Sequence, residues 1–445
     1  MKIDPAVTMR DNFSLEKVIE SPKKNVHLVC IATKPDIIKQ APIYLELKKK
    51  QENLVLVHTG QHYDFNLSGG LEEEFGIKPD INLNIKGHLH HKIGQIISRL
   101  GDIFLFLKEN GKTVVPYVHG DTSTAMAVSN TAFQNEFASV HVEAGLRALT
   151  PKYDIYKEVL KKFDFNTYLD MLSRRENYEA GSLEPYPEQF NTRCADAGTG
   201  LFCAPVELNA DFLYSEGFPE DRIFVCGNSV GDAVEIARKE AKKSNIFEKY
   251  PILQEGFVRF CVHRRENCIS QKRFTTIFNA IKKIVEKGRN VLFISLFATE
   301  AAIDNFGLRG EMEKLQKKKN FIYSKVWPFY HDVIAAMEKC SVCATDSGSM
   351  QEEMNIMKIP CVTLRFGSDR PETFLAGCNM PAPPIDSDLM VKIIESCWDN
   401  QQMKGVSNLY GNQVSQKIIS RVFELIKNKE SLFRFEEDRM GIGGG

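Results

Sequence analysis

Short apolar runs rich in β-branched residues recur along the chain, and longer amphipathic stretches separate them. This alternation is typical of βαβ units, in which a crossover helix connects two parallel strands. The runs expected to form strands are residues 26–32, 54–58, 114–119, 139–142, 201–204, 223–226, 258–262, 291–295, 321–324, 342–345 and 361–364. They suffice for two doubly wound parallel sheets, so the sequence predicts an α/β fold with two Rossmann-type domains.

The amphipathic stretches predict the helices, several of which have Asp, Asn or Ser near their first residue. The expected helices are residues 42–51, 93–110, 273–287, 300–317, 331–339, 388–400 and 412–429. In residues 148–186 the strand rhythm is interrupted, and Ile155, Val159 and Phe163 recur at helical spacing. This segment is interpreted as an insertion that contains two short amphipathic helices.

The domain boundary is expected after residue 206, just beyond the strand 201–204. This places an N-terminal domain at residues 25–206, with the insertion inside it, and a C-terminal domain at residues 207–411. Residues 1–24 are polar and are interpreted as an N-terminal extension. With 445 residues in the chain, the remainder suits two domains of ordinary size and no third.

Composition excludes several classes of partner. The 57 Lys and Arg residues balance 58 Asp and Glu residues, which argues against binding to nucleic acid or to an anionic membrane. Because no apolar run approaches the ~18 residues of a membrane span and no signal peptide is recognisable, we expect a soluble cytoplasmic protein. The Cys340 and Cys343 pair is interpreted as core, and His88, His90 and His91 as a solvated loop, so no metal site is expected.

Polar side chains follow three consecutive predicted strands of the first half. The strings VHTGQHYD, VHGDTST and VHVEAGLR place His58 and Gln61, then His119 and Asp121, then Glu143 and Arg147, at strand ends. Ligands of open parallel sheets bind outside the carboxyl ends of the strands. The repetition of this pattern favours a functional site over three unrelated structural residues.

The second half and the first βα turn carry groups suited to phosphate. Lys34 and Lys39 flank the turn after the first strand, and Arg370 offers a planar, bidentate donor. The turn formed by Ser347, Gly348 and Ser349 could cradle phosphate with its backbone amides. Glu353 follows this turn, and Glu188 lies in a loop that contains prolines. Both carboxylates can accept hydrogen bonds. We therefore expect nucleotide phosphates in one domain and a reacting sugar at the carboxylates of the other.

The usual signatures of cofactor chemistry are missing. No GxGxxG follows the first strand, and neither GxxxxGK[ST] nor HExxH occurs. The chemistry is therefore expected to come from Asp, Glu and His side chains without a cofactor.

These motifs together resemble the non-hydrolysing UDP-N-acetylglucosamine 2-epimerases. The strings are ATKPDIIKQAP, VHTGQHYDFN, VHGDTST, HVEAGLR, PEQFN, HRREN, TDSGSMQEE and RPET, in this order, and the resemblance spans about residues 26–425 apart from the insertion. It implies a GT-B-like pair of Rossmann-type domains with a UDP-sugar in the interdomain cleft. It further implies that the C-terminal helix, about residues 412–438, returns to the first domain, that residues 207–411 bind UDP, and that the protein is a homodimer.

The resemblance also implies a reaction: anti elimination of UDP, formation of a 2-acetamidoglucal, and re-addition on the opposite face. The residues matching catalytic positions are Asp121, Glu143, Glu188 and His263. Those matching substrate-binding positions, together with the phosphate-directed groups above, are Lys34, Lys39, Arg147, Ser347, Gly348, Ser349, Glu353 and Arg370. Gln61 and His62 match a loop that binds an activating second substrate molecule in some members. Which carboxylate acts as base and which as acid stays open.

The chain departs from the family pattern around the substrate. GTRPE reads ATKPD, PEExNR reads PEQFNT, an HxN is replaced by LFATE, and Val333 stands where a Phe is usual. These changes leave the carboxylates intact and predict an altered sugar nucleotide, such as a modified UDP-HexNAc. The insertion is interpreted as a lid or a dimer contact beside the site.

Three other functions remain open at this point. A hydrolysing 2-epimerase would release free N-acetylmannosamine and UDP, because water would capture the intermediate. A GT-B glycosyltransferase would require an acceptor and would not exchange the C2 proton. A catalytically inactive sensor of nucleotide sugars would have no need of the carboxylates.

Overall fold

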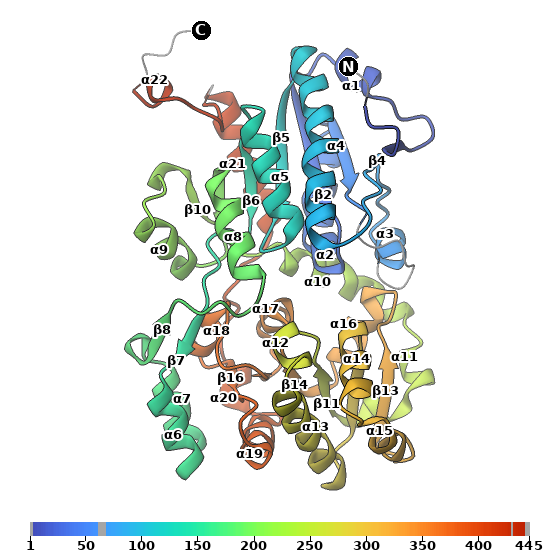
Figure 1. Ribbon diagram of the computed structural model, residues 1–445, viewed down its shortest axis with the longest axis vertical. Helices are drawn as coiled ribbons and strands as arrows, with labels where there is room; N and C mark the ends of the chain where they lie inside the picture. Colours follow the sequence, from blue (N-terminus) through green and yellow to red (C-terminus); the bar gives the residue numbers. More distant parts are fainter. Residues whose placement is uncertain (1–2, 61–67, 429, 441–445) are drawn as a thin grey trace. The chain divides into compact units, whose positions relative to one another are not determined.

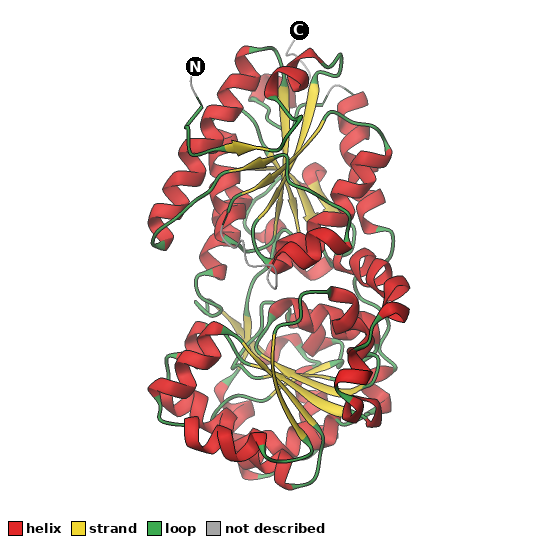
Figure 2. Ribbon diagram, turned by 90° about the vertical axis from the view of Figure 1, so that its right-hand side faces the viewer, coloured by secondary structure: helices red, strands yellow, loops and turns green. Residues whose placement is uncertain are grey.

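The computed structural model describes residues 3–60, 68–428 and 430–440, and these fall into two compact units (Figure 1). Unit 1 comprises Met1–Leu146, Phe190–Ala233 and Tyr410–Gly445, and unit 2 comprises Arg147–Gln189 and Val234–Leu409. Each unit is a layered α/β structure with helices on both faces of its sheet (Figure 2). The structure confirms the predicted α/β class with two Rossmann-type, doubly wound sheets.

The sheet of unit 1 has the strand order β1-β4-β3-β2-β5-β6-β9-β10. Its strands are β1 Thr8–Met9, β2 Asn25–Ile31, β3 Leu54–His58, β4 Ile81–Asn82, β5 Thr113–His119, β6 Ser139–Val142, β9 Thr199–Ala204 and β10 Ile223–Val225. All neighbours pair in parallel except β1 and β4. Strand order reverses between β2 and β5, which is where ligands of such sheets bind.

The helices of unit 1 bury apolar faces against this sheet. They include α1 Leu15–Glu20, α2 Lys34–Lys49, α3 Gly70–Glu74, α4 Leu89–Glu109, α5 Ser123–Gln134, α9 Glu207–Ser215, α21 Val414–Lys427 and α22 Glu436–Arg439. Helix α8 Glu188–Ala197 begins in unit 2 and continues in unit 1, whereas α10 Val230–Glu240 begins in unit 1 and continues in unit 2. Leu100 and Phe104 of α4 pack with Val26 and Leu28 of β2 in one apolar core. Helix α21 joins unit 1 through Asp232, which accepts hydrogen bonds from the amides that begin this helix.

The sheet of unit 2 is wholly parallel, in the order β13-β12-β11-β14-β15-β16. Its strands are β11 Phe257–Cys261, β12 Val291–Ser295, β13 Phe321–Lys325, β14 Cys340–Thr345, β15 Cys361–Thr363 and β16 Asn379–Pro381. Its helices are α11 Ile246–Lys249, α12 Arg265–Cys268, α13 Gln271–Glu286, α14 Phe297–Asn305, α15 Arg309–Gln316, α16 Tyr330–Met337, α17 Gly348–Met357, α18 Pro371–Leu375, α19 Ser387–Cys397 and α20 Gln401–Lys404. The reversal here lies between β11 and β14.

The structure places the domain boundary later than residue 206. Strand β10 pairs in parallel with β9, with Ile223 opposite Phe202, so it completes the first sheet instead of opening the second. The N-terminal extension is likewise part of unit 1, because Leu15 and Val18 are buried and Met9 lies opposite Ile81 in the sheet. These few buried apolar residues were not recognised in the sequence, because residues 1–24 are mostly polar.

The segment 148–186 belongs to unit 2 and not to the first domain. It contains a small antiparallel ribbon, β7 Leu149–Pro151 and β8 Tyr178–Ala180, and two helices, α6 Tyr153–Lys161 and α7 Phe165–Leu172, as predicted. Leu149 and Ser368 exchange backbone hydrogen bonds, and the hydroxyl of Tyr168 donates to the carbonyl of Pro381 at 2.9 Å. The segment therefore packs against the loop that follows β15 and against the end of β16.

Among the residues that the structure describes, no helix is both long and apolar enough to cross a membrane.

Candidate active site

Glu143 follows β6 at the strand-end edge of unit 1 and lies in a buried cluster of charged groups. Nζ of Lys39 donates to its Oε1 at 2.6 Å, and Nδ2 of Asn228 donates to the same oxygen at 2.9 Å. Nε2 of His119 lies 2.5 Å from its Oε2. These surroundings favour a charged carboxylate, because each neighbour presents a donor to an acceptor oxygen. Asp36, Lys39, His119, Glu143 and Asn228 are called the Glu143 cluster below.

Glu143 has a strained backbone conformation within this cluster. Glu143 has φ 68°, a left-handed conformation that is uncommon for a residue with a side chain. Gly120, with φ 59°, lies so close that a Cβ atom there would be 2.7 Å from Oε2 of Glu143. A glycine is thus required between His119 and Asp121 for the Glu143 carboxylate to keep its place.

Asp36 completes the cluster from the first turn of α2. Its Oδ1 lies 3.1 Å from Nδ1 of His119, and its Oδ2 accepts from the amide and hydroxyl of Thr33. Burial opposes the charged form of His119, but the Glu143 and Asp36 carboxylates outweigh it and raise the pKa of the imidazole. The end of β5 is therefore held by ionic contacts of His119 with both carboxylates.

A second buried histidine supports the same turn. Nε2 of His141 lies 2.7 Å from the carbonyl oxygen of Gly120, and its Nδ1 lies 2.7 Å from Asp196. Asp121 itself is almost fully buried, and its carbonyl accepts from Asn191 at 3.2 Å. Asp121 and Glu143 thus stand at the ends of the adjacent parallel strands β5 and β6, as the strand-end pattern predicted.

Asn228 was not among the predicted site residues, although a signal for it exists. It follows the strand β10, so the strand-end argument that selected Asp121 applies to it too. The string GNSVG at residues 227–231 also matches the GxSxG motif of serine hydrolases. Here the hydroxyl of Ser229 is buried and donates to the carbonyl of Lys39 at 2.7 Å, so it is a structural residue and not a nucleophile.

In unit 2 the loop after β11 meets the loop after β14. The buried carboxylate of Asp346 accepts from the amides of His263 and Arg264 at 3.0 Å each and from Nδ2 of Asn267 at 3.0 Å. Nδ1 of His263 lies 3.1 Å from the same carboxylate. Burial would lower the pKa of His263, but the charge of Asp346 outweighs burial and raises this pKa to about 10. Burial would raise the pKa of Asp346, but the contact with His263 helps to lower it to about 2.

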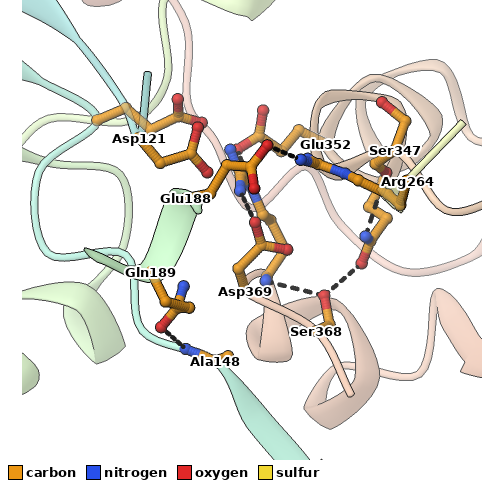
Figure 3. Close-up of polar contacts among 12 residues, drawn as sticks. Asp121, Ala148, Glu188, Gln189, Arg264, Ser347, Glu352, Ser368 and Asp369 are labelled. Carbon is orange, nitrogen blue, oxygen red and sulfur yellow. Dashed lines mark hydrogen bonds and ion pairs between the residues drawn. The ribbon is translucent and has the colours of Figure 1, made fainter. Parts of the chain in front are cut away.

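Glu188 begins α8 and forms an ion pair with Arg264 (Figure 3). The next residue, Gln189, accepts a hydrogen bond from the amide of Ala148 at 2.9 Å, as Figure 3 also shows. The start of the 148–186 segment is thereby tied to the start of the helix that carries Glu188.

The turn that the sequence predicted as an anion site lies at the N-terminus of α17. Ser347 is the N-cap of this 10-residue helix, and Gly348 is its first residue. A Cβ atom at Gly348 would lie 2.7 Å from Nη1 of Arg370, so the glycine allows the guanidinium to approach the helix start. Exposed amides and the helix dipole at such an end favour phosphate.

Other predicted residues have partners that the sequence did not reveal. Nε of Arg370 donates to Glu352 at 3.0 Å, and its Nη1 pairs with Asp369. Glu353 accepts from the hydroxyl of Tyr330 at 2.9 Å. Arg370 and Glu353 are thus held inside unit 2 by neighbouring side chains.

The remaining predicted residues divide between the two units. Lys34 is the first residue of α2 in unit 1, Ser349 is the second residue of α17, and Arg147 is buried at the start of unit 2. Lys39 is fully buried against Glu143. Gln61 and His62 lie outside the described residues. In the described ranges, no group of three or more His, Cys, Asp and Glu side chains is arranged to hold a metal ion.

Comparison with known proteins bears on both units. The family model described as UDP-N-acetylglucosamine 2-epimerase matches residues 45–161 and 178–424. Residues 162–177 are unmatched, so the extra segment is shorter than the predicted insertion at 148–186. The UDP-N-acetylglucosamine 2-epimerase of Methanocaldococcus jannaschii is 28% identical over 401 residues, which are 88% of this chain and 97% of the relative. The UDP-2,3-diacetamido-2,3-dideoxy-D-glucuronate 2-epimerase of Pseudomonas aeruginosa is 26% identical over 361 residues, 79% of this chain and 87% of that protein.

A solved structure has the same arrangement of elements. The crystal structure of the Methanocaldococcus jannaschii UDP-GlcNAc 2-epimerase in complex with UDP-GlcNAc and UDP superposes with a TM-score of 0.73 at 28% identity, covering 90% of this chain and 99% of that one. This likeness confirms the predicted GT-B-like fold class. The family match covers the chain from β3 onward in the first sheet, all strands of the second sheet, and the strand ends that carry Asp121, Glu143 and His263. The chain therefore belongs to the UDP-N-acetylglucosamine 2-epimerase family.

Proposed function

We propose that the protein inverts C2 of UDP-N-acetylglucosamine, or of a closely related UDP-HexNAc, by elimination of UDP and re-addition. The observation that carries this proposal is the placement of Asp121 and Glu143 at the ends of adjacent parallel strands, in a chain that matches the family model on both sides of them. Two carboxylates at one edge suit a reaction in which a carbon acid loses and regains a proton.

The proposed reaction has two reversible steps. In the first, a base removes the C2 proton while the bond between C1 and the UDP oxygen breaks, which yields a 2-acetamidoglucal and UDP. In the second, UDP attacks C1 again while C2 receives a proton on its opposite face. We propose that Asp121, Glu143, Glu188 and His263 serve this chemistry.

The surroundings of these four residues support different tasks. Glu143 is held by the donors Lys39 and Asn228, which favour its charged form. Glu188 is paired with Arg264 in unit 2. His263 keeps its positive charge beside Asp346, because the pKa of the imidazole is raised to about 10. A charged imidazole suits the negative charge that develops on the departing diphosphate.

UDP binding is proposed for unit 2. The amides of Gly348 and Ser349 at the start of α17 would receive the diphosphate, with Arg370 beside them. The amide of Ser347, which the sequence also assigned to this role, instead donates to the hydroxyl of Thr345 at 3.1 Å. Lys34, Lys39, Arg147 and Glu353 remain proposed substrate contacts, and Gln61 and His62 remain proposed effector contacts.

We propose a UDP-HexNAc as the sugar nucleotide. The relative from Pseudomonas aeruginosa is named for a diacetamido-glucuronate, whereas the one from Methanocaldococcus jannaschii is named for N-acetylglucosamine, and their identities to this chain are 26% and 28%. A nuclear magnetic resonance time course with both UDP-sugars would test the proposal. Appearance of a manno-configured UDP-sugar from either one supports it, and no change in any UDP-HexNAc with folded protein contradicts it.

The same time course separates the proposal from its hydrolysing alternative. If water captured the intermediate, free N-acetylmannosamine and UDP would accumulate together, and no UDP-linked manno sugar would appear. If the protein were a glycosyltransferase, the UDP-sugar would change only after an acceptor was added.

A further inference from the structure

Both ring nitrogens of His119 face carboxylate oxygens. Nε2 lies 2.5 Å from Oε2 of Glu143, and Nδ1 lies 3.1 Å from Oδ1 of Asp36. The ring is buried, and it connects helix α2 with the loop after β6. A histidine that only fills space needs no acceptor at both nitrogens.

These two contacts determine how many hydrogens His119 and the two carboxyl groups need between them. A carboxylate oxygen can only accept, so each contact requires a hydrogen on the ring nitrogen or on the carboxyl group. A neutral imidazole carries one hydrogen and would leave one contact as two acceptors facing each other. Either His119 is an imidazolium, or one of the two acids is protonated.

The second carboxylate oxygen of each acid indicates which group carries the proton. Oε1 of Glu143 already accepts from Lys39 and Asn228, and Oδ2 of Asp36 accepts from the amide of Thr33 at 3.0 Å and its hydroxyl at 2.9 Å. Such donors stabilise the charged form of each acid. With His119 charged, the two cations Lys39 and His119 balance the two anions Asp36 and Glu143.

We propose that His119 is a positioning residue, which bridges Asp36 and Glu143 as an imidazolium and thereby holds Glu143 as a correctly oriented carboxylate for the reaction. The consequence for turnover rests on the proposed function, whereas the charge state of His119 does not. The partners of Glu143 then include donors from different parts of unit 1, among them Lys39 of α2, His119 of β5 and Asn228 after β10.

Nitrogen-15 magnetic resonance of the histidine side chains tests the charge state directly. His27 is a matched control, because it is equally buried but its Nδ1 lies 2.8 Å from the hydroxyl of Tyr117 and burial lowers its pKa to about 4. At pH 8 we expect hydrogens on both ring nitrogens of His119 and on only one of His27. Resonances are assigned by their loss in His119→Gln, or in His119→Asn if that variant folds better, and in His27→Gln.

A pair of substitutions tests the positioning role. The amide of Asn reaches about as far as Nδ1, so His119→Asn keeps a donor for Asp36 and loses the donor for Glu143. The longer Gln reaches about as far as Nε2, so His119→Gln keeps the Glu143 contact and loses the one to Asp36. We expect His119→Asn to lower kcat about 100-fold, as a misplaced reacting group does. We expect His119→Gln to recover most of that loss, and KM to change little in either variant.

Two results would overturn the proposal. One is a neutral His119 at pH 8 in the folded protein. The other is an equal loss of kcat in both variants, which a purely structural role of the ring predicts. If the unmodified protein converts no UDP-HexNAc, the proposed function fails, but the magnetic resonance result still decides the charge state of His119.

Discussion

Nζ of Lys39 lies 2.6 Å from Oε1 of Glu143, and both side chains are completely buried. The two residues are 104 positions apart in the chain. An isolated charge at such a depth would be expensive, whereas the pair satisfies both charges. Lys39 thus stabilises the carboxylate that the family motif HVEAGLR supplies, in addition to any contact that it makes with a substrate.

Replacing Lys39 by Met should therefore destabilise unit 1. Removing one partner of a buried pair leaves an uncompensated charge, which costs about 3–5 kcal/mol of unfolding free energy. Calorimetry or urea unfolding followed by circular dichroism measures the loss. Lys49→Met on the same helix is the control, because Lys49 is 80% exposed and 4.0 Å from its partner Glu46. Unchanged stability with weaker UDP binding would instead mean that Lys39 serves only the substrate.

A methyl group at Gly120 should disable the site beyond its effect on stability. Gly120→Ala places a Cβ atom 2.7 Å from Oε2 of Glu143 and must displace that carboxylate. Gly111→Ala is a matched control, since Gly111 also has positive φ, 74°, but has nothing within 4 Å of the added atom. Both variants should lose about 1–2 kcal/mol through the left-handed backbone. Only Gly120→Ala should lose turnover in a coupled epimerase assay, and equal turnover in the two would refute the close packing.

The pair of His263 and Asp346 should make stability depend on pH. The pKa of His263 is raised from 6.5 to about 10, so its contribution is complete below pH 6.5 and disappears as the pH rises through 10. The pKa of Asp346 is lowered from 3.8 to about 2, so its contribution is complete above pH 3.8 and is lost as the pH falls through 2.

Asp346→Asn should consequently cost about 1.5–3 kcal/mol at neutral pH, the range for hydrogen bonds to charged groups, because Asp346 is buried whereas the His263 side chain is 30% exposed. The difference from the unmodified protein should shrink as the pH approaches 10, because His263 of the unmodified protein then loses the charge that Asp346 stabilises. Unfolding free energies measured at a series of pH values check this. A difference that stays constant from pH 6 to 10 would show that Asp346 acts only through its hydrogen bonds to the backbone.

Glu188→Gln should separate chemistry from binding. The substitution keeps the shape of the side chain but removes the charge that faces Arg264, and we expect kcat to fall about 10²–10⁴-fold, the range for a general acid or base. Affinity for UDP, measured by calorimetry, should change little. Glu184→Gln is the control in the same loop, because Glu184 pairs with Arg273 at 2.9 Å and is not among the proposed site residues. Equal turnover in both variants would remove Glu188 from the mechanism.

The sheets could be predicted well because their strands are buried on both faces. The expected strand 139–142 has the bounds of β6, and 291–295 those of β12. Strands β4 and β16 were missed because they are only two and three residues long. Helix α5 was missed because its small residues form no apolar stripe, and the expected helix 300–317 is broken at Gly307, which adopts φ 68°.

The position of several candidate residues in the fold could be predicted from the sequence, but their contacts could not. Parallel strands deliver their carboxyl ends to one edge, so Asp121, Glu143 and His263 could be selected from the strand pattern. Their partners could not, because the contact of Glu143 with Lys39 depends on how deeply α2 packs. Lys39 was expected to face phosphate, as a cation after a first strand often does, and its burial against a carboxylate became visible only in three dimensions.

In the proposed reaction, C2 of the sugar loses and regains a proton while UDP leaves and returns. This reaction is tested most directly by incubating the protein with UDP-N-acetylglucosamine in deuterated water and recording the nuclear magnetic resonance spectrum of the sugar. We expect deuterium at C2 of both the gluco and manno forms of the UDP-sugar. Formation of a manno product that keeps its original C2 hydrogen would contradict it.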